Sequence, residues 1–221
     1  ATLLGVGDQM LVFDRGRVTR LDPSTGTELE LASGVTSIST AYEPAGVVTV
    51  TRDQLGLAVR IIGTDGILRA GIRASSEAVV HGAVDDHLVI SAGGLVRAVP
   101  NQGEPIEVGS GRVVAVGEDL IVRVTCETVA SCVMSSGGVA DPERWSVALP
   151  EIVAGVVPEL WNEPGQVSPD GTRVALHLAQ AAGTTQGVLV IDLETGDWVH
   201  SPEVSAGLGS FAWALDSRFI A

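Results

Sequence analysis

The sequence repeats itself, and this repetition restricts the fold more than any other feature of the chain. Residues Leu3–Leu31 align with Val80–Val108 without a gap. The identical pairs include Val12 and Val89, Gly16 and Gly93, Arg20 and Arg97, Pro23 and Pro100, and Gly26 and Gly103. The two segments lie two periods of about 38 residues apart, and a period of this length is typical of proteins that copy one supersecondary unit.

Two shorter motifs recur as well. The segment Leu21–Gly26 (LDPSTG) matches Ile191–Gly196 (IDLETG). The segment Val167–Ala175 (VSPDGTRVA) matches Trp213–Ala221 (WALDSRFIA) when one gap is allowed. The first pair lies 170 residues apart, which is four periods of about 42 residues. The repeat therefore extends from the N-terminal part of the chain to its C-terminal part.

Within each period, the pattern is that of short β-strands joined by tight turns. Runs of Val, Ile, Leu and Thr, such as Val47–Thr51 and Leu120–Val124, alternate with Gly, Asp, Pro, Ser and Asn. Helical periodicity is nearly absent. A period near 40 residues with four strands predicts an all-β fold, a β-propeller of four-stranded antiparallel blades. Such blades bury both of their apolar faces against their neighbours and leave only short edges exposed.

We expect a single β-propeller domain over residues 1–221. The predicted blades are residues 1–34, 35–74, 75–109, 110–150 and 151–205, with a partial sixth blade over 206–221. Five blades are then complete. The sixth either continues in further chain or is shared between the two ends, an arrangement that removes free sheet edges.

At these motifs, the sequence resembles the TolB-like and WD40-like β-propellers of bacteria. The resemblance rests on Val167–Ala175 and Val190–Gly196, with weaker matches at Trp213–Ser217 and Leu21–Gly26. Residues 35–150 depart from both motifs. The resemblance implies a propeller that is either a protein-binding module or the gating domain of a prolyl-oligopeptidase-type hydrolase. Because the motifs specify turns and no chemistry, the resemblance implies no catalytic residue.

The composition excludes several classes of function. The chain has 27 acidic and 13 basic residues, a net charge of −14, and every basic residue is an arginine. A P-loop lysine and a Schiff-base lysine are therefore excluded. We expect no nucleic-acid partner, because phosphate binding needs a basic surface. No apolar run approaches the 18 residues of a membrane span, so we expect no membrane insertion of this segment. The Arg-only, Ala/Val/Gly-rich composition indicates a bacterial origin.

The two cysteines, Cys126 and Cys132, flank five residues between two strand-like runs. A hairpin would place them opposite each other, where a disulfide is geometrically reasonable. A disulfide would indicate an oxidising compartment. The alternative is a pair of free, half-buried thiols in a cytosolic protein. Metal binding is disfavoured, because the spacing is not CxxC and no second pair exists.

Few residues stand out as contacts for a partner or ligand. Asp85, Asp86 and His87 form the densest polar cluster, which is either a ligand set or simply a tight turn in which Asp is favoured. His177 alternates with leucines in a strand and could face a central channel. Trp161 lies in a proline-bounded segment and is either a partner contact or a packing residue. We expect Trp213 to pack between blades.

We favour a non-enzymatic role: a protein- or ligand-binding propeller module of a bacterial envelope protein, extracytoplasmic and without cofactors or metals. Neither a G-x-S-x-G elbow nor a G-x-G-x-x-G loop is present. The partner would be a basic or neutral protein surface, or a small ligand. Because the chain begins with Ala1, we expect a mature domain or part of a longer, membrane-anchored chain.

Two other roles remain open. The first is an enzyme or the gating domain of a hydrolase, with Ca²⁺ or substrate in the axial channel. It would need several acids and an Asn at one end, and Asn101 and Asn162 are the only asparagines. The second is an assembly role, in which the open last blade accepts a strand from a neighbouring molecule.

Overall fold

The protein is all-β in the part of the chain that the structure describes. The computed structural model describes residues 2–6, 9–41, 46–128, 131–149, 165–179, 185–201, 212–214, 216–217 and 219–220. Within these ranges the chain forms strands β1 to β22 and no helix. This confirms the all-β prediction, which rested on short apolar runs separated by turn residues.

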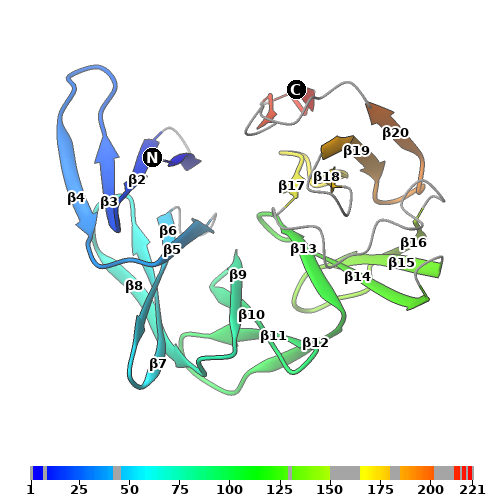
Figure 1. Ribbon diagram of the computed structural model, residues 1–221, viewed down its shortest axis with the longest axis horizontal. Helices are drawn as coiled ribbons and strands as arrows, with labels where there is room; N and C mark the ends of the chain where they lie inside the picture. The colour runs from blue at the N-terminus through cyan, green and yellow to red at the C-terminus, as the bar shows by residue number, and fades with distance from the viewer. Residues whose placement is uncertain are drawn as a thin grey trace. The chain divides into compact units, whose positions relative to one another are not determined.

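The first four strands form one antiparallel sheet in chain order (Figure 1). They are β1 (Thr2–Val6), β2 (Gln9–Asp14), β3 (Arg17–Leu21) and β4 (Glu28–Ala32). The turn between β2 and β3 consists of Arg15 and Gly16, with φ angles of 48° and 79°. Two positive φ angles define the type I′ turn, whose twist matches that of hairpin strands. We call each such four-stranded unit a blade.

Strands β5 to β12 form the next two blades. Blade 2 contains β5 (Ser37–Ala41), β6 (Gly46–Asp53), β7 (Gly56–Gly63) and β8 (Leu68–Ala74). Blade 3 contains β9 (Val79–Val84), β10 (His87–Ala92), β11 (Leu95–Pro100) and β12 (Ile106–Ser110). A parallel pairing of Ala41 with Ala83 links their first strands, so the two blades form one eight-stranded sheet.

The remaining strands repeat the pattern. Blade 4 contains β13 (Arg112–Val116), β14 (Ile121–Thr128), β15 (Ser131–Gly137) and β16 (Trp145–Ala148). Blade 5 contains β17 (Gln166–Val167), β18 (Arg173–Ala179), β19 (Thr185–Asp192) and β20 (Trp198–Ser201). Strands β21 (Ala212–Trp213) and β22 (Phe219–Ile220) pair with each other. Among the described residues there are thus five four-stranded blades and one two-stranded partial blade, as predicted.

Blade 2 buries both of its faces. Val47 belongs to a cluster with Leu11 of blade 1, whereas the next residue, Val48, belongs to a cluster with Leu88 of blade 3. Successive side chains of a strand point to opposite faces of the sheet. The near-continuous apolar run of β6 is therefore explained by neighbours on both sides.

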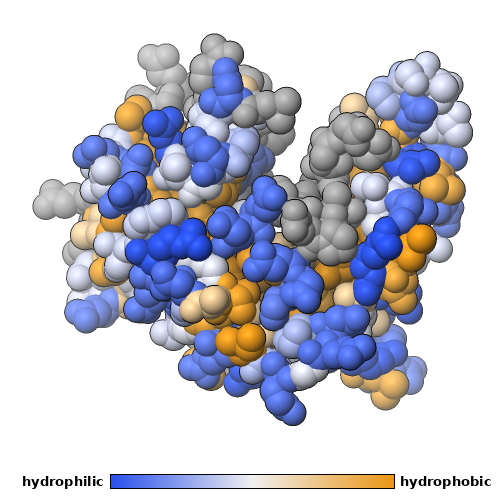
Figure 2. All heavy atoms as spheres, turned by 180° about the vertical axis from the view of Figure 1, so that it is seen from behind, coloured by the Kyte–Doolittle hydropathy of each residue, from blue (hydrophilic) through white to orange (hydrophobic). Residues whose placement is uncertain are grey.

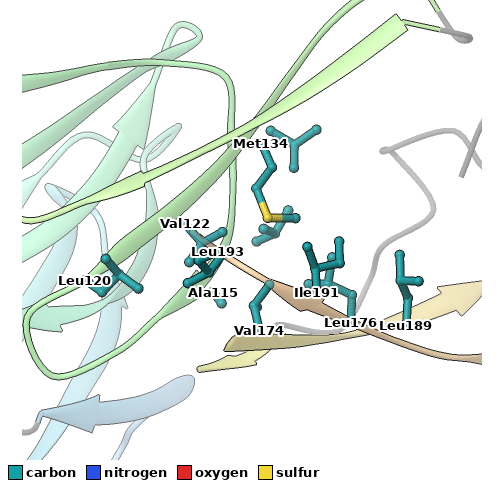
Figure 3. Close-up of a cluster of buried hydrophobic side chains, with 11 residues drawn as sticks. Ala115, Leu120, Val122, Met134, Val174, Leu176, Leu189, Ile191 and Leu193 are labelled. Atoms are coloured by element: carbon teal, nitrogen blue, oxygen red, sulfur yellow. The ribbon is translucent and has the colours of Figure 1, made fainter. Parts of the chain in front are cut away.

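Blades 4 and 5 share another apolar core (Figure 3). Met134 and Val122 of blade 4 face side chains from β18 and β19, the two central strands of blade 5. The buried residues of this cluster are Val114, Ala115, Leu120, Val122, Val124, Met134, Val174, Leu176, Leu189, Ile191 and Leu193. Burying a Val, Leu, Ile or Met side chain contributes about 1.5–3 kcal/mol. This core therefore holds blades 4 and 5 together.

The chain divides into two compact units, residues 1–93 with 97–107 and residues 94–96 with 108–221. The cores described above each lie within one unit. The prediction of a single domain over residues 1–221 stays a prediction.

Candidate functional site

Carboxylates gather at one end of each blade. When consecutive strands pair antiparallel, the first–second and third–fourth turns lie at the same end of the sheet. We call these the acidic turns. Their described acidic residues are Asp22, Asp65, Asp85, Asp86, Glu104, Glu118, Asp119, Asp141, Glu143, Asp170, Glu194, Asp197 and Asp216. Apart from the half-buried Asp22, all are exposed.

The opposite ends of blades 1 and 2 differ in charge. There Arg73 Nη1 donates hydrogen bonds to both carboxylate oxygens of Asp53, each 2.9 Å away. Arg15 Nε lies 3.9 Å from Asp14 Oδ2. Arginines neutralise part of the acidic turns too, since Arg144 Nη1 lies 3.5 Å from Asp119 Oδ2. Carboxylates nevertheless outnumber arginines at the acidic turns, so negative charge concentrates there.

Two of the third–fourth turns are built in the same way. Oδ1 of Asp22 accepts hydrogen bonds from the backbone amides two and three residues further on, at 2.8 and 3.3 Å. Oδ1 of Asp192 accepts the equivalent pair at 3.1 and 3.0 Å. Gly26 and Gly196, with φ of 70° and 78°, donate their amides to the carbonyls of these aspartates. The recurring Asp-x-x-x-Gly spacing in the sequence is thus a turn signature.

These hydrogen bonds keep the two carboxylates ionised. Hydrogen bonds from Ser24 lower the pKa of Asp22 to about 2. Hydrogen bonds from Thr195 lower the pKa of Asp192 below its usual range. Donors aimed at a carboxylate stabilise its charged form. Both turns therefore remain negative at any physiological pH.

Asp170 holds the first–second turn of blade 5. Its Oδ1 accepts hydrogen bonds from Ser168 Oγ at 2.6 Å and from the Thr172 amide at 3.1 Å. Burial by itself would raise the pKa of Asp170, but these hydrogen bonds outweigh it and lower the pKa to about 2. The carboxylate of Asp170 therefore stabilises the turn formed by its own Ser-x-Asp-Gly-Thr sequence.

Within the second unit, consecutive acidic turns lie side by side. A methyl group placed on Gly171 would lie 3.8 Å from Oδ1 of Asp119 in blade 4. On the other side, the Asp170 amide donates a hydrogen bond to Ser217 Oγ at 3.1 Å. Three first–second turns thus form a continuous row, in which Asp119, Asp170 and the exposed Asp216 carry the charge.

The predicted cluster at residues 85–87 forms the β9–β10 turn. Asp85 has a φ of 50°, a conformation that Asp tolerates better than most residues. His87 is the first residue of β10, and its Nδ1 lies 2.7 Å from Asp86 Oδ1. Both aspartates are exposed, and they belong to the acidic turns. Their role in binding a partner or ligand stays a prediction.

The other predicted contact residues receive less support. Trp161 lies outside the described residues. His177 lies in β18, where it pairs with Val188. Trp213 packs beside Ala175 and Val188 and donates its indole Nε1 to the Gln166 carbonyl at 3.0 Å. This confirms the prediction that Trp213 packs between blades.

The predicted disulfide is present. Cys126 of β14 and Cys132 of β15 pair directly across the hairpin and are bonded to each other. Both are half-buried and pack against the core shared by blades 4 and 5. Disulfides are typical of proteins in oxidising compartments.

Arg123, which the sequence does not single out, anchors one of the acidic turns. Its side chain is only 3 % exposed. Nη2 donates to the carbonyl of Pro142 at 2.9 Å, and Nη1 donates to that of Ser110 at 3.1 Å. Burial lowers the pKa of Arg123, and the nearby Glu143 opposes this shift. The turn that carries Asp141 and Glu143 is therefore tied to a buried cation.

Trp198 is a second candidate contact residue that the sequence does not single out. It begins strand β20 directly after the Asp192 turn, and 46 % of the residue is exposed. Its neighbour Val199 is 70 % exposed. Hydrophobic residues also reach the surface on the face drawn in Figure 2, between more numerous hydrophilic ones. Aligning the two Asp-turn motifs would have placed Trp198 opposite Glu28 and marked it as unusual.

In the described part of the chain, no group of three or more His, Cys, Asp or Glu side chains is placed to hold a metal ion. No helix there is long and apolar enough to cross a membrane.

Solved structures establish the fold. No protein-family model matches the chain, and a comparison with curated proteins finds no match. Among similar structures, Hsv2 from Kluyveromyces lactis has a TM-score of 0.56 at 11 % identity, covering 95 % of this chain and 65 % of its own. An acylaminoacyl peptidase from Pyrococcus horikoshii has a TM-score of 0.55 at 11 % identity, covering 96 % and 40 %. Hydrazine synthase from Kuenenia stuttgartiensis has 0.52 at 10 %, covering 89 % and 63 %.

These neighbours are β-propeller proteins. The chain has a β-propeller fold. The neighbours include both enzymes and non-enzymes, and at this level of identity the likeness extends to the fold alone. The chain spans about two thirds or less of the length of these three neighbours. The TolB-like and WD40-like resemblance of the turn motifs stays a prediction.

Proposed function

We propose that this chain is a non-enzymatic binding module of a bacterial envelope protein, located outside the cytoplasm, whose acidic turns contact a basic protein surface. The observation that carries the proposal is the position of the charge. The chain has a net charge of −14, and its described blades carry exposed carboxylates at their first–second and third–fourth turns. Surfaces of one sign attract partners of the other sign and speed their encounter.

The rigidity of the acidic turns supports the proposal. Asp22, Asp170 and Asp192 are held by hydrogen bonds within their own turns, and these bonds favour the ionised form. A preorganised charged surface loses little conformational entropy when it binds. Such turns are therefore suited to recognition.

The proposed compartment is supported by the disulfide between Cys126 and Cys132, because oxidising conditions prevail outside the cytoplasm. The TolB-like resemblance of the Val167–Ala175 motif points the same way. An envelope protein that presents an acidic propeller would meet its partner in the periplasm or at the cell surface.

Charge-reversed peptides test the proposal. We expect an oligoarginine peptide to bind and an oligoglutamate peptide of equal length not to bind. Raising the salt concentration from about 20 to about 200 mM should weaken the binding severalfold, because salt screens exposed charges. Titration calorimetry or fluorescence anisotropy would measure both.

A matched pair of double variants tests whether the peptide binds at the acidic turns. Asp85→Asn with Asp86→Asn removes two charges from an acidic turn, and Asn tolerates the backbone conformation of residue 85. Glu77→Gln with Glu127→Gln removes two exposed charges elsewhere. We expect the first pair to weaken binding more than the second. Binding that does not depend on the salt concentration or on the charge of the peptide would contradict the proposal.

A further inference from the structure

Trp198 occupies a position where the fold does not need a tryptophan. The third–fourth turn of blade 1 has the same hydrogen bonds as that of blade 5, and its outer strand begins with Glu28 in the same register. Glu28 pairs with Leu21, just as Trp198 pairs with Ile191. Because the turn forms equally with a charged residue there, its geometry does not account for an indole that is nearly half exposed.

Blade 4 shows what a tryptophan at this position can hold. Its outer strand also begins with a tryptophan, Trp145, and the guanidinium of Arg144 lies 5.3 Å from the centre of the indole. The same guanidinium lies 3.5 Å from the carboxylate of Asp119. A cation over an indole face, paired with a carboxylate, is a favourable arrangement for arginine.

Blade 5 also begins its outer strand with a tryptophan, but a different residue stands at the place of the arginine. The residue before Trp198 is Asp197, where blade 4 has Arg144 before Trp145. Asp197 and Glu194 are both exposed. Arg173 of β18 already forms an ion pair with Asp192 of the neighbouring strand β19, with its Nε 4.0 Å from Asp192 Oδ2.

We propose that Trp198, with Asp197 and Glu194, binds an arginine side chain of a partner protein. This inference rests on the proposed function and specifies its contact point. The guanidinium stacks on the indole and pairs with a carboxylate, as Arg144 does within blade 4. Arginine is the fitting ligand because its planar guanidinium combines stacking with carboxylate pairing, whereas a lysine ammonium is a more strongly hydrated point charge.

Hydrogen bonds fix the backbone of the turn that carries Trp198, Asp197 and Glu194. The amide of Asp197 donates to Thr195 Oγ1 at 3.1 Å, and the Asp192 amide donates to the Asp197 carbonyl at 2.8 Å. The backbone on which Trp198 stands is therefore fixed. An exposed tryptophan on a rigid support is typical of residues that dominate protein interfaces.

Trp198→Glu is the decisive variant, because the fold already accepts a glutamate at the equivalent position 28. Simple charge attraction predicts that this added carboxylate strengthens the binding of an oligoarginine peptide. Stacking predicts that loss of the indole weakens it. We expect binding to weaken about threefold to tenfold, the range for a cation–π contact. The affinity for an oligolysine peptide should change less than twofold.

Two further variants complete the test. Trp198→Ala should weaken oligoarginine binding to a similar degree, whereas Glu28→Ala, the matched change in blade 1, should alter it by less than twofold. Unchanged melting temperatures would show that each variant is folded. If Trp198→Glu tightens binding, or if Trp198→Ala equals Glu28→Ala, the arginine site is wrong while a charge-dependent binding module stands. If the unmodified protein binds neither basic peptide, the proposed function fails and the arginine site fails with it.

Discussion

The backbone amide of Asp170 donates a hydrogen bond to the side-chain oxygen of Ser217 in the following repeat, at 3.1 Å. Ser217 is buried and lies at a φ of 59°. It corresponds to Gly171 in the aligned motif, and the amides of both residues donate to the residue three positions earlier. The contact links two copies of the same turn and holds β21 and β22 against blade 5.

Ser217→Ala tests this link. The variant removes the acceptor and leaves the amide of Asp170 without its partner, so we expect the free energy of unfolding to fall by about 0.5–1.5 kcal/mol. Urea denaturation followed by tryptophan fluorescence would measure the loss. Thr25→Ala, on an exposed turn of blade 1, is the reference and should cost less. Equal stability of Ser217→Ala and the unmodified protein would show that the link contributes nothing.

The carboxylate of Asp170 makes stability depend on pH. Its pKa is about 2 in the folded protein, below the usual value of 3.8, so the ionised group favours the folded state. This contribution is fully present above about pH 4 and is lost as the pH falls from about 4 to about 2. We expect Asp170→Asn to lose less stability than the unmodified protein over this interval, as measured by urea midpoints. A parallel loss in both proteins would assign the acid sensitivity to other groups.

The disulfide between Cys126 and Cys132 closes a short loop, so its effect on stability should be modest. In the chain-entropy relation, a loop of this size contributes roughly 2 kcal/mol. We expect a reducing agent, or the Cys126→Ser and Cys132→Ser double variant, to lower the melting temperature by several degrees without unfolding the protein at room temperature. Complete unfolding on reduction would show that the hairpin tip is essential to the fold.

The sequence predicted the blades because strand and turn patterns are local. Many strands contain short apolar runs, and the aspartate at position 22 or 192 accepts hydrogen bonds from the amides two and three residues further on in its own turn. Nothing local reveals that Arg123 is almost fully buried, because its partners, the carbonyls of Ser110 and Pro142, lie 13 and 19 residues away. Arginine is usually exposed, so its burial depends on packing that only the folded chain defines.

The exposure of Trp198 could not be predicted from its strand alone, for a different reason. The pattern of its strand is compatible with either face of the sheet, and exposure depends on what covers the outer strand. Comparison of the two Asp-turn motifs could have identified it, since Glu28 stands at the equivalent place. Trp161, by contrast, is predicted from its proline-bounded sequence as a candidate contact, but it lies outside the described residues.

The Ca²⁺ hypothesis of an enzymatic propeller has a direct thermal test. The described residues provide no group of three side chains suited to a metal ion. We expect the melting temperatures in millimolar Ca²⁺ and in EDTA to agree within about one degree, since a ligand stabilises only a fold that binds it. A rise of several degrees in Ca²⁺ would favour the enzyme alternative over the binding module.

Gly109 and Arg123 provide the sharpest test of packing. Gly109 has a φ of 124°, and a methyl group there would overlap the Arg123 guanidinium. Gly93 also has a positive φ, 60°, but a methyl group there would meet open space. Gly109→Ala therefore combines backbone strain with displacement of a buried cation from its two carbonyl partners, whereas Gly93→Ala carries the strain alone.

We expect Gly93→Ala to cost about 1 kcal/mol and Gly109→Ala about 3 kcal/mol or more. Urea denaturation of the two variants under the same conditions would measure the difference. Because Arg123 anchors the turn that carries Asp141 and Glu143, Gly109→Ala should also weaken binding of a basic peptide more than Gly93→Ala does. Equal losses of stability would mean that the guanidinium moves aside freely and that its burial does not hold the acidic turn in place.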